Sequence, residues 1–557
     1  MLRPILYACL ILGLEALCAA GQEYDYVVVG SGPGGGPLAV DLAKAGSSVL
    51  FLEAGSDLLE DPTYSETYED IDSATERQYK HMTWRTGNES FYVGSDPPEG
   101  AEQLGIWYPR AATFGDYIAN ITGDGSWAAS EMRKIYEDIE NSHYVKNGTN
   151  GHGFSGWLET NRANGLWIGV DSVATTILQA ILEHLGVPGN MSVEDLRDQL
   201  SRDINALDSE GDQATGVFGI ITHTDSEERR FNPINYVRRV LAEDPDLPLF
   251  IELNSTFTGI VWDPLSSGGP PAVMGINYVA ESSAYNADPR YDPSRNTTSM
   301  FTYIGNELII AGCAFNSPQI LKLSGIGPTE ELKYNLTVVA DLPGVGANLG
   351  DIYEGSVLKS SVSEGGRDIV LPVPYSFERY WLGYPDDHGA NAFTIAFALK
   401  PSHSSQGMVT LRSADPLDPP DVNFRFFEKG ADQDLQAMLE AVIFVGNMKT
   451  RISNSSGLVP IEELSPCPTT SRTCTGNGIK DTLKQAYSRH ATGTGAIGDT
   501  TSDPMAVIDS EFRVKGVDRL RIVDASVFPK PPGAFPTLPT FMISRKAAKV
   551  IIQNGRT

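Results

Sequence analysis

Residues 24–35 read YDYVVVGSGPGG, so a β-branched stretch runs directly into a glycine-rich turn. Apolar residues then recur at helical spacing up to Ala43, and residues 47–52 resemble a second strand that ends at Glu53. A strand, a G-x-G-x-x-G turn, a helix and a second strand followed by an acid form the pattern of a dinucleotide-binding βαβ unit. The pattern predicts a Rossmann-like α/β fold around this turn.

Each part of the motif has a physical role. Gly30 permits the tight turn that holds Ser31, Gly32 lets the backbone approach a pyrophosphate, and Gly35 allows close packing of helix and strand. Glu53 is placed to accept hydrogen bonds from a ribose diol, and its charge disfavours a 2′-phosphate. The motif alone does not separate FAD from NAD, and an ordinary βαβ turn is the alternative reading.

Length and charge limit the possible functions. The chain has 557 residues, which allows two to four domains or one large domain with a second grafted onto it. Hydrophobic residues make up 41%, which is enough for a folded core. The net charge is −29, and the sequence contains no cluster of basic residues, so we expect no nucleic-acid partner.

The first 20 residues resemble a secretory signal peptide. Arg3 precedes a run of ten apolar residues at 5–14, and small residues at 18–20 offer a cleavage site before Gly21. The alternatives are a membrane anchor and a buried helix, but spanning a bilayer takes about 20 apolar residues. We therefore expect a protein of the secretory pathway (extracellular, cell wall or vacuole) with no stable membrane anchor.

Sequons and cysteines agree with an oxidising compartment. Cys467 and Cys474 lie in one loop rich in Pro, Ser and Thr, and we expect them to form a structural disulfide. Cys313 lies in an apolar run and is expected to be an inert buried thiol. The cysteine and histidine spacing predicts no metal site. The eight predicted glycosylation sites are Asn88, Asn120, Asn147, Asn190, Asn254, Asn296, Asn335 and Asn454.

Five further segments resemble the glucose–methanol–choline (GMC) oxidoreductases, a family of FAD-dependent alcohol oxidases and dehydrogenases. They are 108–115 (YPRAATFG), 312–328 (GCAFNSPQILKLSGIGP), 344–349 (GVGANL), 490–494 (HATGT) and 516–526 (GVDRLRIVDAS). The resemblance runs from about residue 24 to the C-terminus. Within the family, the chain looks closest to the secreted fungal enzymes of secondary-metabolite pathways, the patulin synthase type.

The resemblance implies FAD as cofactor, a small alcohol as substrate, and oxygen or another electron acceptor as partner. Asp524 and Ala525 match the second FAD contact of the family, and Thr258 matches the position whose backbone faces the adenine. His490 matches the catalytic histidine beside flavin N5, although a lone histidine is more often structural. A histidine is a suitable acceptor for the hydroxyl proton, while the flavin accepts the hydride.

Two departures from the family keep a second hypothesis open. Phe535 stands where the family usually places a second His or Asn, and we assign it to shaping the site. After Gly115 the family continues with a Gly/Ser-rich stretch against the flavin, whereas here residues 116–120 (DYIAN) follow at once. This difference resembles an internal deletion or a real divergence. The alternative is therefore a catalytically impaired flavoprotein or a non-catalytic binding protein; an NAD-dependent enzyme is disfavoured by the Asp524 motif.

The expected fold class is mixed α/β, with a Rossmann-like FAD-binding domain and an inserted substrate-binding domain built on an antiparallel sheet. The expected FAD-binding domain covers 22–345, with substrate-domain insertions around 60–210. A substrate-binding domain at 346–485 and a C-terminal return at 486–557 follow it. Alternation at 409–412 indicates an antiparallel strand, and 432–448 reads as an amphipathic helix. The apolar face expected for that helix comprises Leu435, Met438, Leu439, Val442 and Ile443.

Overall fold

A computed structural model gives the structure of the chain. It describes residues 22–55, 83–86, 89–92, 114–162, 165, 168–169, 172–184, 186–187, 191–207, 217–219, 221–227, 229, 231–264, 268–286, 291–294, 297–332, 334, 336–361, 392–399, 407–428, 430, 432–443, 461–465, 476–483, 490–532 and 536–555.

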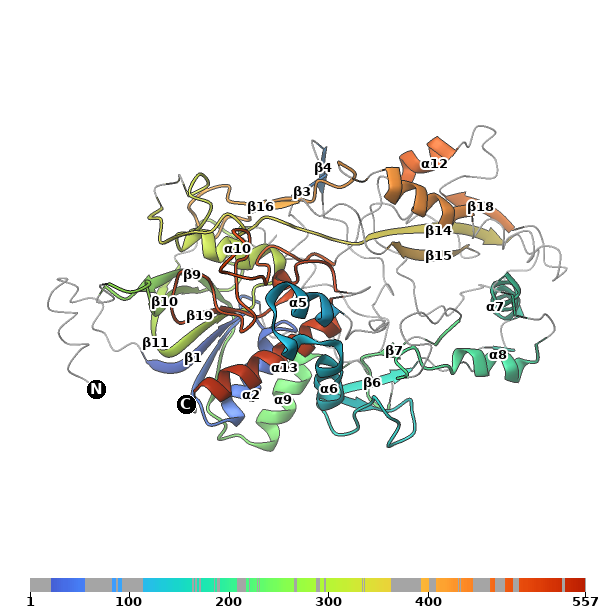
Figure 1. Cartoon of the computed structure of the whole chain (residues 1–557), viewed down its shortest axis with the longest axis horizontal. Coiled ribbons are helices and arrows are strands. Elements are labelled where there is room, and N and C mark those ends of the chain that lie inside the picture. The colour runs from blue at the N-terminus through green and yellow to red at the C-terminus, as the bar shows by residue number, and fades with distance from the viewer. Residues whose placement is uncertain are drawn as a thin grey trace.

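The main sheet has seven strands and combines a parallel and an antiparallel part (Figure 1). The parallel part runs in the order β8–β2–β1–β11–β19, and β10 and β9 extend the sheet antiparallel from the first half of β11. The strands are β1 (Glu23–Val29), β2 (Val49–Leu52), β8 (Leu249–Glu252), β9 (Ser255–Trp262), β10 (Val273–Ala280), β11 (Ser299–Ile310) and β19 (Leu520–Ile522). The Rossmann-like α/β fold predicted from the glycine turn is confirmed.

The parallel strands end in register at one edge of the sheet. Val29, the last residue of β1, pairs with Leu52 at the end of β2 and with Ile310 at the end of β11. Ile310 in turn pairs with Ile522 at the end of β19. The segments that follow these four strands therefore meet at one edge, where open α/β sheets bind their ligands.

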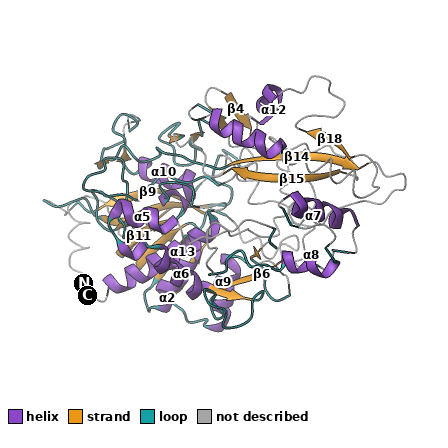
Figure 2. Cartoon of the chain, turned by 45° about the vertical axis from the view of Figure 1, so that its right-hand side comes forward, coloured by secondary structure: helices purple, strands orange, loops and turns teal. Residues whose placement is uncertain are grey.

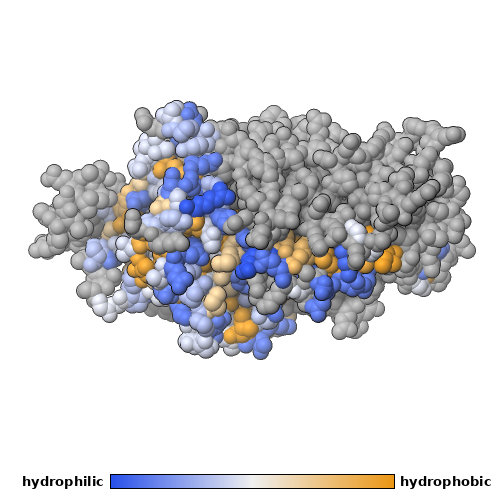
Figure 3. Space-filling model, turned by 90° about the horizontal axis from the view of Figure 1, so that it is seen from above, coloured by the Kyte–Doolittle hydropathy of each residue, from blue (hydrophilic) through white to orange (hydrophobic). Residues whose placement is uncertain are grey.

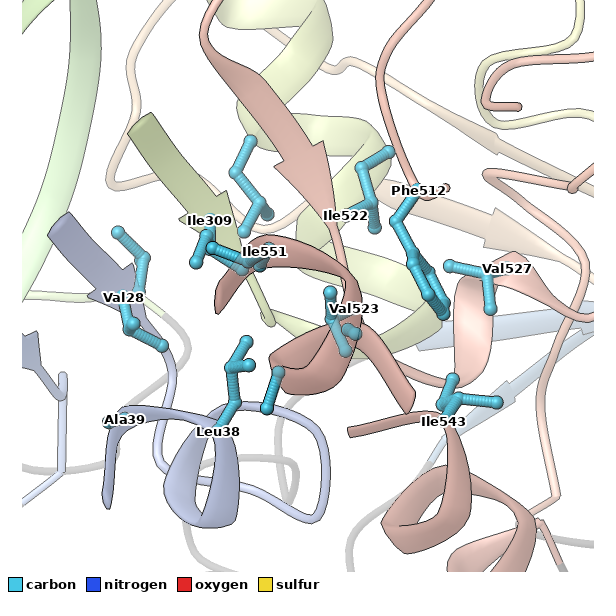
Figure 4. Packing of buried hydrophobic residues seen from close by; sticks show 14 of the residues in the cluster. Val28, Leu38, Ala39, Ile309, Phe512, Ile522, Val523, Val527, Ile543 and Ile551 are labelled. Atoms are coloured by element: carbon cyan, nitrogen blue, oxygen red, sulfur yellow. The ribbon is translucent and has the colours of Figure 1, made fainter. Parts of the chain in front are cut away.

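Helices cover the sheet and bury its apolar side chains. Helix α2 (Gly35–Lys44) packs directly on β1, β2 and β8, α9 (Pro233–Glu243) and α13 (Thr537–Asn554) pack against α2, and α6 (Ala129–Ile139) packs against α13. Figure 4 shows Val28 of β1, Leu38 of α2, Ile309 of β11 and Ile543 of α13 within one cluster. All four side chains are fully buried, so residues more than 500 positions apart share one core.

The rest of the described chain builds smaller sheets and helices beside this core (Figures 1 and 2). One antiparallel sheet comprises β14 (Tyr353–Ser361), β15 (Ala392–Leu399) and β18 (Ile461–Ser465). A second joins β16 (Met408–Thr410), β17 (Asp421–Asn423), β3 (Thr83–Thr86) and β4 (Glu89–Tyr92), and a third joins β5 (Glu140–Ser142), β6 (Leu158–Arg162) and β7 (Ile221–Thr222). Short strands β12 (Ile326–Gly327) and β13 (Ala340–Asp341) pair separately, and further helices are α5 (Phe114–Thr122), α7 (Ser172–His184), α8 (Val193–Leu200), α10 (Cys313–Leu323) and α12 (Gly476–Leu483). The short helical turns are η1 (Gly125–Trp127) and η3 (Ala525–Val527).

Local predictions for this part are mostly confirmed. Of the strand expected at 409–412, Val409 and Thr410 lie in β16, which pairs antiparallel with β17, whereas residues 411–412 lie beyond the end of the strand. Residues 432–443 are helical, and the predicted apolar residues of this helix are buried except Ile443, which is 49% exposed. Including Ile443 in the buried face was wrong. The domain boundaries stay a prediction.

Strands β8 and β9 are consecutive in the chain and are separated by a turn. The chain turns between them at Asn254, which takes a left-handed conformation with φ of +52°. Asparagine is one of the few residues that tolerate this region. The backbone N–H of Asn254 donates to the Gly55 carbonyl, so the turn is tied to the end of β2.

The described part of the surface is mostly hydrophilic on the face seen in Figure 3. Hydrophilic residues cover much of it, and hydrophobic residues lie among them. Within the described ranges, the helices are too short or too polar to cross a lipid bilayer.

A buried histidine joins β5 to the loop that follows α8. Nδ1 of His152 lies 3.0 Å from Oε2 of Glu140, and Nε2 lies 2.8 Å from Oδ2 of Asp203. The hydroxyl of Tyr136 also donates to Glu140, and Tyr144 contacts the imidazole edge-on. Burial alone would lower the pKa of His152, but the hydrogen bonds to Asp203 and Glu140 outweigh burial and raise the pKa to about 9.

This cluster predicts a loss of stability in alkali. The pKa of His152 is higher in the folded chain, at about 9, than its ordinary value of 6.5, so its stabilisation is complete below 6.5 and disappears as pH rises through 9. We expect the free energy of unfolding in urea to fall by about 2 kcal/mol between about pH 7 and about pH 9.5. His152→Gln should remove this slope. An equal slope in the wild type and the variant would contradict the assignment.

Candidate active site

The glycine turn combines two crowded positions with an open one. Gly30 has a φ of +104°, and a Cβ atom there would lie 2.3 Å from the Ala311 carbonyl oxygen. A Cβ at Gly35 would lie 2.0 Å from the Gly30 carbonyl oxygen, whereas a Cβ at Gly32 would meet nothing within 4 Å. The turn is therefore held tightly against β11 while Gly32 faces open space, as close approach of a ligand to its backbone requires.

The start of α2 and Glu53 surround the same turn. No side chain caps α2 at Gly34, so the first turn of the helix offers N–H groups and the positive end of its dipole. The Glu53 carboxylate accepts hydrogen bonds from the backbone N–H of Ser31 at 2.8 Å and of Gly55 at 2.7 Å. These contacts fix Glu53 beside the turn, where its remaining lone pairs can accept from a ribose.

Asp524 follows β19, and its buried carboxylate is surrounded by hydrogen-bond donors. Its carboxylate accepts from the Cys313 N–H at 3.0 Å, the Ser317 hydroxyl at 2.5 Å and the Ser526 N–H at 2.8 Å. Burial raises the pKa of Asp524, and these hydrogen bonds act in the opposite direction. Ala525 comes directly after it in η3 and is buried. A Cβ at Gly34 would lie 1.9 Å from the Val523 carbonyl oxygen, so the two ends of the chain touch here.

The position of Cys313 differs from the one expected from the sequence. Its side chain is exposed, so the expected buried thiol was wrong. The surrounding protein nevertheless desolvates the thiol, and with the charge of Asp524 it raises the pKa of Cys313 to about 12. Cys313 also has a φ of +66°, which an L-residue adopts at a cost of about 1–2 kcal/mol. The thiol is therefore protonated near neutral pH and is a poor nucleophile.

A backbone hydrogen bond joins the segment that begins at His490 to η3, which follows Asp524. The N–H of Gly495 donates to the Ser526 carbonyl at 2.9 Å, so the 490–495 segment runs alongside η3. Thr492 pairs with Gly350 through two hydrogen bonds of 2.9 and 3.0 Å. His490 is half-buried at the start of this segment.

Thr258 lies at an irregularity of β9. Phe257 pairs with Tyr278 and Gly259 pairs with Asn277, which leaves the half-buried Thr258 without a partner in the strand register. Such bulges redirect a side chain and expose backbone groups. The strand begins beside Glu53, whose carbonyl accepts from the Ser255 N–H.

Two buried hydroxyl oxygens near these segments have no hydrogen-bond partner among the described residues. They are Oγ of Ser526 and Oγ1 of Thr492. Buried polar groups are normally satisfied, so unmatched hydroxyls here fit a site that a polar ligand completes. Together with the open space at Gly32 and the uncapped helix, they fit a dinucleotide.

Some predicted residues lie outside the described part of the chain. These are Phe535, Cys467 and Cys474, together with the sequons at Asn88, Asn190, Asn296, Asn335 and Asn454.

The departure after Gly115 falls within α5. The chain is helical from Phe114 to Thr122, and a Cβ at Gly115 would lie 2.1 Å from the Trp127 carbonyl oxygen. Phe114 contacts Phe528 edge-on, with ring centroids 5.3 Å apart. The start of α5 is thus packed against the chain that follows Asp524.

Three contacts of the site could not be found in the sequence. Gly34 approaches β19, Ser317 donates to Asp524, and Asp351 accepts from the His490 N–H at 2.9 Å across 139 residues. For the first contact the sequence offers one local signal, the extra glycine at Gly34 in the GPGG turn. The contacts of Ser317 and Asp351 depend on the tertiary fold and have no local signal.

Comparison with known proteins gives consistent matches. Two family models, both described as GMC oxidoreductase, match residues 290–354 and 403–544. The oxygen-dependent choline dehydrogenase of Rhizobium etli is 25% identical, covering 95% of this chain and 96% of that protein. The choline oxidase of Arthrobacter globiformis is 24% identical, covering 95% and 94%. The glucose-methanol-choline family oxidoreductase mfmG of Annulohypoxylon moriforme is 25% identical, covering 96% and 95%.

Solved structures share the fold. A formate oxidase from Aspergillus oryzae, studied for FAD modification, superposes with a TM-score of 0.74 at 19% identity, covering 97% of this chain and all of the other. A pyridoxine 4-oxidase from Mesorbium loti superposes with a TM-score of 0.68 at 19% identity, covering 96% and 99%.

Proposed function

This chain belongs to the GMC oxidoreductases, and from that premise we propose that it oxidises a hydroxylated small molecule with His490 as the base. It is an FAD-dependent oxidoreductase that acts on CH–OH groups. From the sequence resemblance alone we further propose a role in secondary metabolism, with oxygen or another compound as electron acceptor; the oxygen-dependent choline dehydrogenase and the choline oxidase among the relatives support oxygen.

We infer which residues of the chain would hold the pyrophosphate, ribose, ribityl chain and adenine of FAD. The Gly30–Gly32 backbone and the start of α2 would hold the pyrophosphate, and Glu53 would accept from the ribose. Asp524 and Ala525 would contact the pyrophosphate and ribityl chain, and the bulge at Thr258 would face the adenine. FAD, when bound, supplies the two-electron acceptor that no side chain can provide.

His490 would hold the proton that leaves the substrate hydroxyl. Imidazole has an ordinary pKa near neutrality, so it can accept a proton and release it again at ambient pH. The backbone pairing of its segment with η3 supports this role, because η3 directly follows the proposed FAD contact Asp524. Phe535, from its position in the sequence, would form an apolar wall that shapes the substrate space without donating a hydrogen bond.

One observation carries this proposal: the segments bearing the glycine turn, Glu53, Asp524 and His490 meet at the carboxyl edge of the parallel part of the main sheet. The test is an anaerobic panel of choline, benzyl alcohol, pyridoxine and primary aliphatic alcohols added to the purified protein. We expect the protein to be yellow and at least one alcohol to bleach the flavin absorbance.

A second candidate function is retained because of α5. Helix α5 begins at Phe114, so residues 114–122 lack the Gly/Ser-rich stretch that the family places against the flavin. Folded protein that is colourless, or yellow but never bleached by any alcohol, would favour a non-catalytic binding protein or an impaired flavoprotein.

We also propose that the chain is glycosylated in the secretory pathway. Asn120 and Asn147 are exposed, so their amides can accept a glycan. Asn254 is half-buried in the turn beside Glu53, and we expect it to stay unmodified. In a secretory eukaryotic host, endoglycosidase should lower the mass, and Asn120→Gln and Asn147→Gln should each remove one glycan. A mass equal to the bare polypeptide before treatment would contradict secretion by this route.

A further inference from the structure

A buried carboxylate holds the backbone at His490. Oδ1 of Asp351 accepts the His490 N–H at 2.9 Å and the Ile352 N–H at 2.8 Å. Asp351 is only 1% exposed, so water cannot replace these donors as it would at the surface. One oxygen of Asp351 therefore fixes two segments that are far apart in the sequence.

The contact belongs to a longer pairing between residues 346–352 and 490–495. Gly350 and Thr492 exchange two backbone hydrogen bonds, and the Gly346 N–H donates to the Thr494 carbonyl at 2.8 Å. Gly493 has a φ of +96°, and a Cβ there would lie 2.1 Å from the Asn348 carbonyl oxygen. These contacts hold the segment from Thr492 onward, whereas Asp351 holds His490 itself.

The same segment also reaches the chain that follows Asp524. The Asn348 side-chain amide donates to the Pro529 carbonyl at 3.0 Å, and a Cβ at Gly350 would lie 3.6 Å from Pro531. Residues 346–352 therefore contact both the His490 segment and the segment that continues from the proposed FAD contact. Moving one of them would change the position of His490 relative to that contact.

We propose that Asp351 is a positioning residue, which sets the location of His490 by holding its backbone N–H. The proposal deepens the proposed function, since it assigns Asp351 a role in the reaction that His490 would serve. Asp351 does not need to contact the substrate. A displacement of about 1 Å in a catalytic group can cost about 100-fold in rate, so the loss of this contact should slow the reaction.

The test compares Asp351→Asn with Asp351→Ala in the FAD-loaded protein. The Asn carbonyl oxygen can accept both N–H groups, whereas Ala can accept neither. Crystal structures should show the His490 backbone in place in Asp351→Asn and displaced by about 1 Å or more in Asp351→Ala. With the panel alcohol that bleaches the wild type fastest, the limiting rate of flavin reduction should fall about 30-fold or more in Asp351→Ala and less than about threefold in Asp351→Asn.

Asp509→Ala is the matched control. Oδ1 of Asp509 also accepts two backbone N–H groups, from Glu511 and Arg513, each at 2.9 Å, but in a turn outside the proposed site. We expect it to lower stability and leave the limiting rate unchanged. The substrate concentration for half-maximal reduction should also change little in Asp351→Ala, because the substrate is not contacted.

The outcomes separate this proposal from the proposed function. An undisplaced His490 in the Asp351→Ala crystal would overturn the positioning role, whatever the kinetics show. Equal losses in Asp351→Asn and Asp351→Ala would also overturn it, since they would indicate a need for the charge. If His490→Ala itself reduces flavin at the wild-type rate, the base assignment fails, while the crystal comparison still decides the role of Asp351. In the His490→Ala background, Asp351→Ala should cause no further slowing.

Discussion

Replacing His490 with Ala is expected to slow anaerobic flavin reduction by about 100-fold or more while FAD stays bound. The substituted side chain can no longer accept the hydroxyl proton, so the alcohol must lose it to water or to a weaker base. The backbone contacts that hold this segment, from the His490 N–H to Asp351 and from Thr492 to Gly350, do not involve the imidazole. The fold and the cofactor should therefore be retained.

The measurement is stopped-flow absorbance of the FAD-loaded variant mixed with a panel alcohol. His143→Ala is a suitable control. Nε2 of His143 lies 2.6 Å from Oε2 of Glu159, in a part of the fold that contributes no residue to the proposed site. We expect the control to reduce flavin at the wild-type rate. Wild-type reduction in His490→Ala with full FAD content would show that another group takes the proton.

The second large effect is expected in the glycine turn, where two neighbouring positions should behave in opposite ways. Gly34→Ala places a Cβ 1.9 Å from the Val523 carbonyl oxygen, a backbone atom that cannot move alone. We expect the free energy of unfolding to fall by at least about 3 kcal/mol and FAD binding to be lost.

Gly32→Ala is the matched substitution, because its Cβ meets no atom within 4 Å. The apoprotein should unfold within about 1 kcal/mol of the wild type, since nothing in the chain is displaced. FAD should bind at least about tenfold more weakly, because the methyl group occupies the space that the pyrophosphate needs. Urea unfolding of the apoprotein and quenching of flavin fluorescence measure the two quantities. Unchanged FAD affinity in Gly32→Ala would place the cofactor elsewhere.

The sequence predicted the part of the site that local geometry determines. A β-branched run, a glycine turn and an acid after the second strand place Gly30, Gly32 and Glu53 through the periodicity of one βαβ unit. Asp524 and His490 carried no such local signal, and they could be proposed only through resemblance to a family.

Tertiary contacts account for what the sequence could not give. Asp351 and His490 are 139 residues apart, and no periodicity relates them. Likewise, the positive φ of Cys313 follows from its connection between β11 and α10, where its N–H donates to Asp524. An apolar run suggested burial of Cys313 because hydropathy cannot tell a core position from one at the open edge of a sheet.

A crystal structure of the FAD-loaded protein tests the central claim most directly. The account predicts a pyrophosphate between the Gly32 backbone and Ala525, with the flavin ring beside the His490 imidazole. A flavin bound elsewhere, or a His490 ring too far from flavin N5 to reach a substrate hydroxyl there, would contradict it.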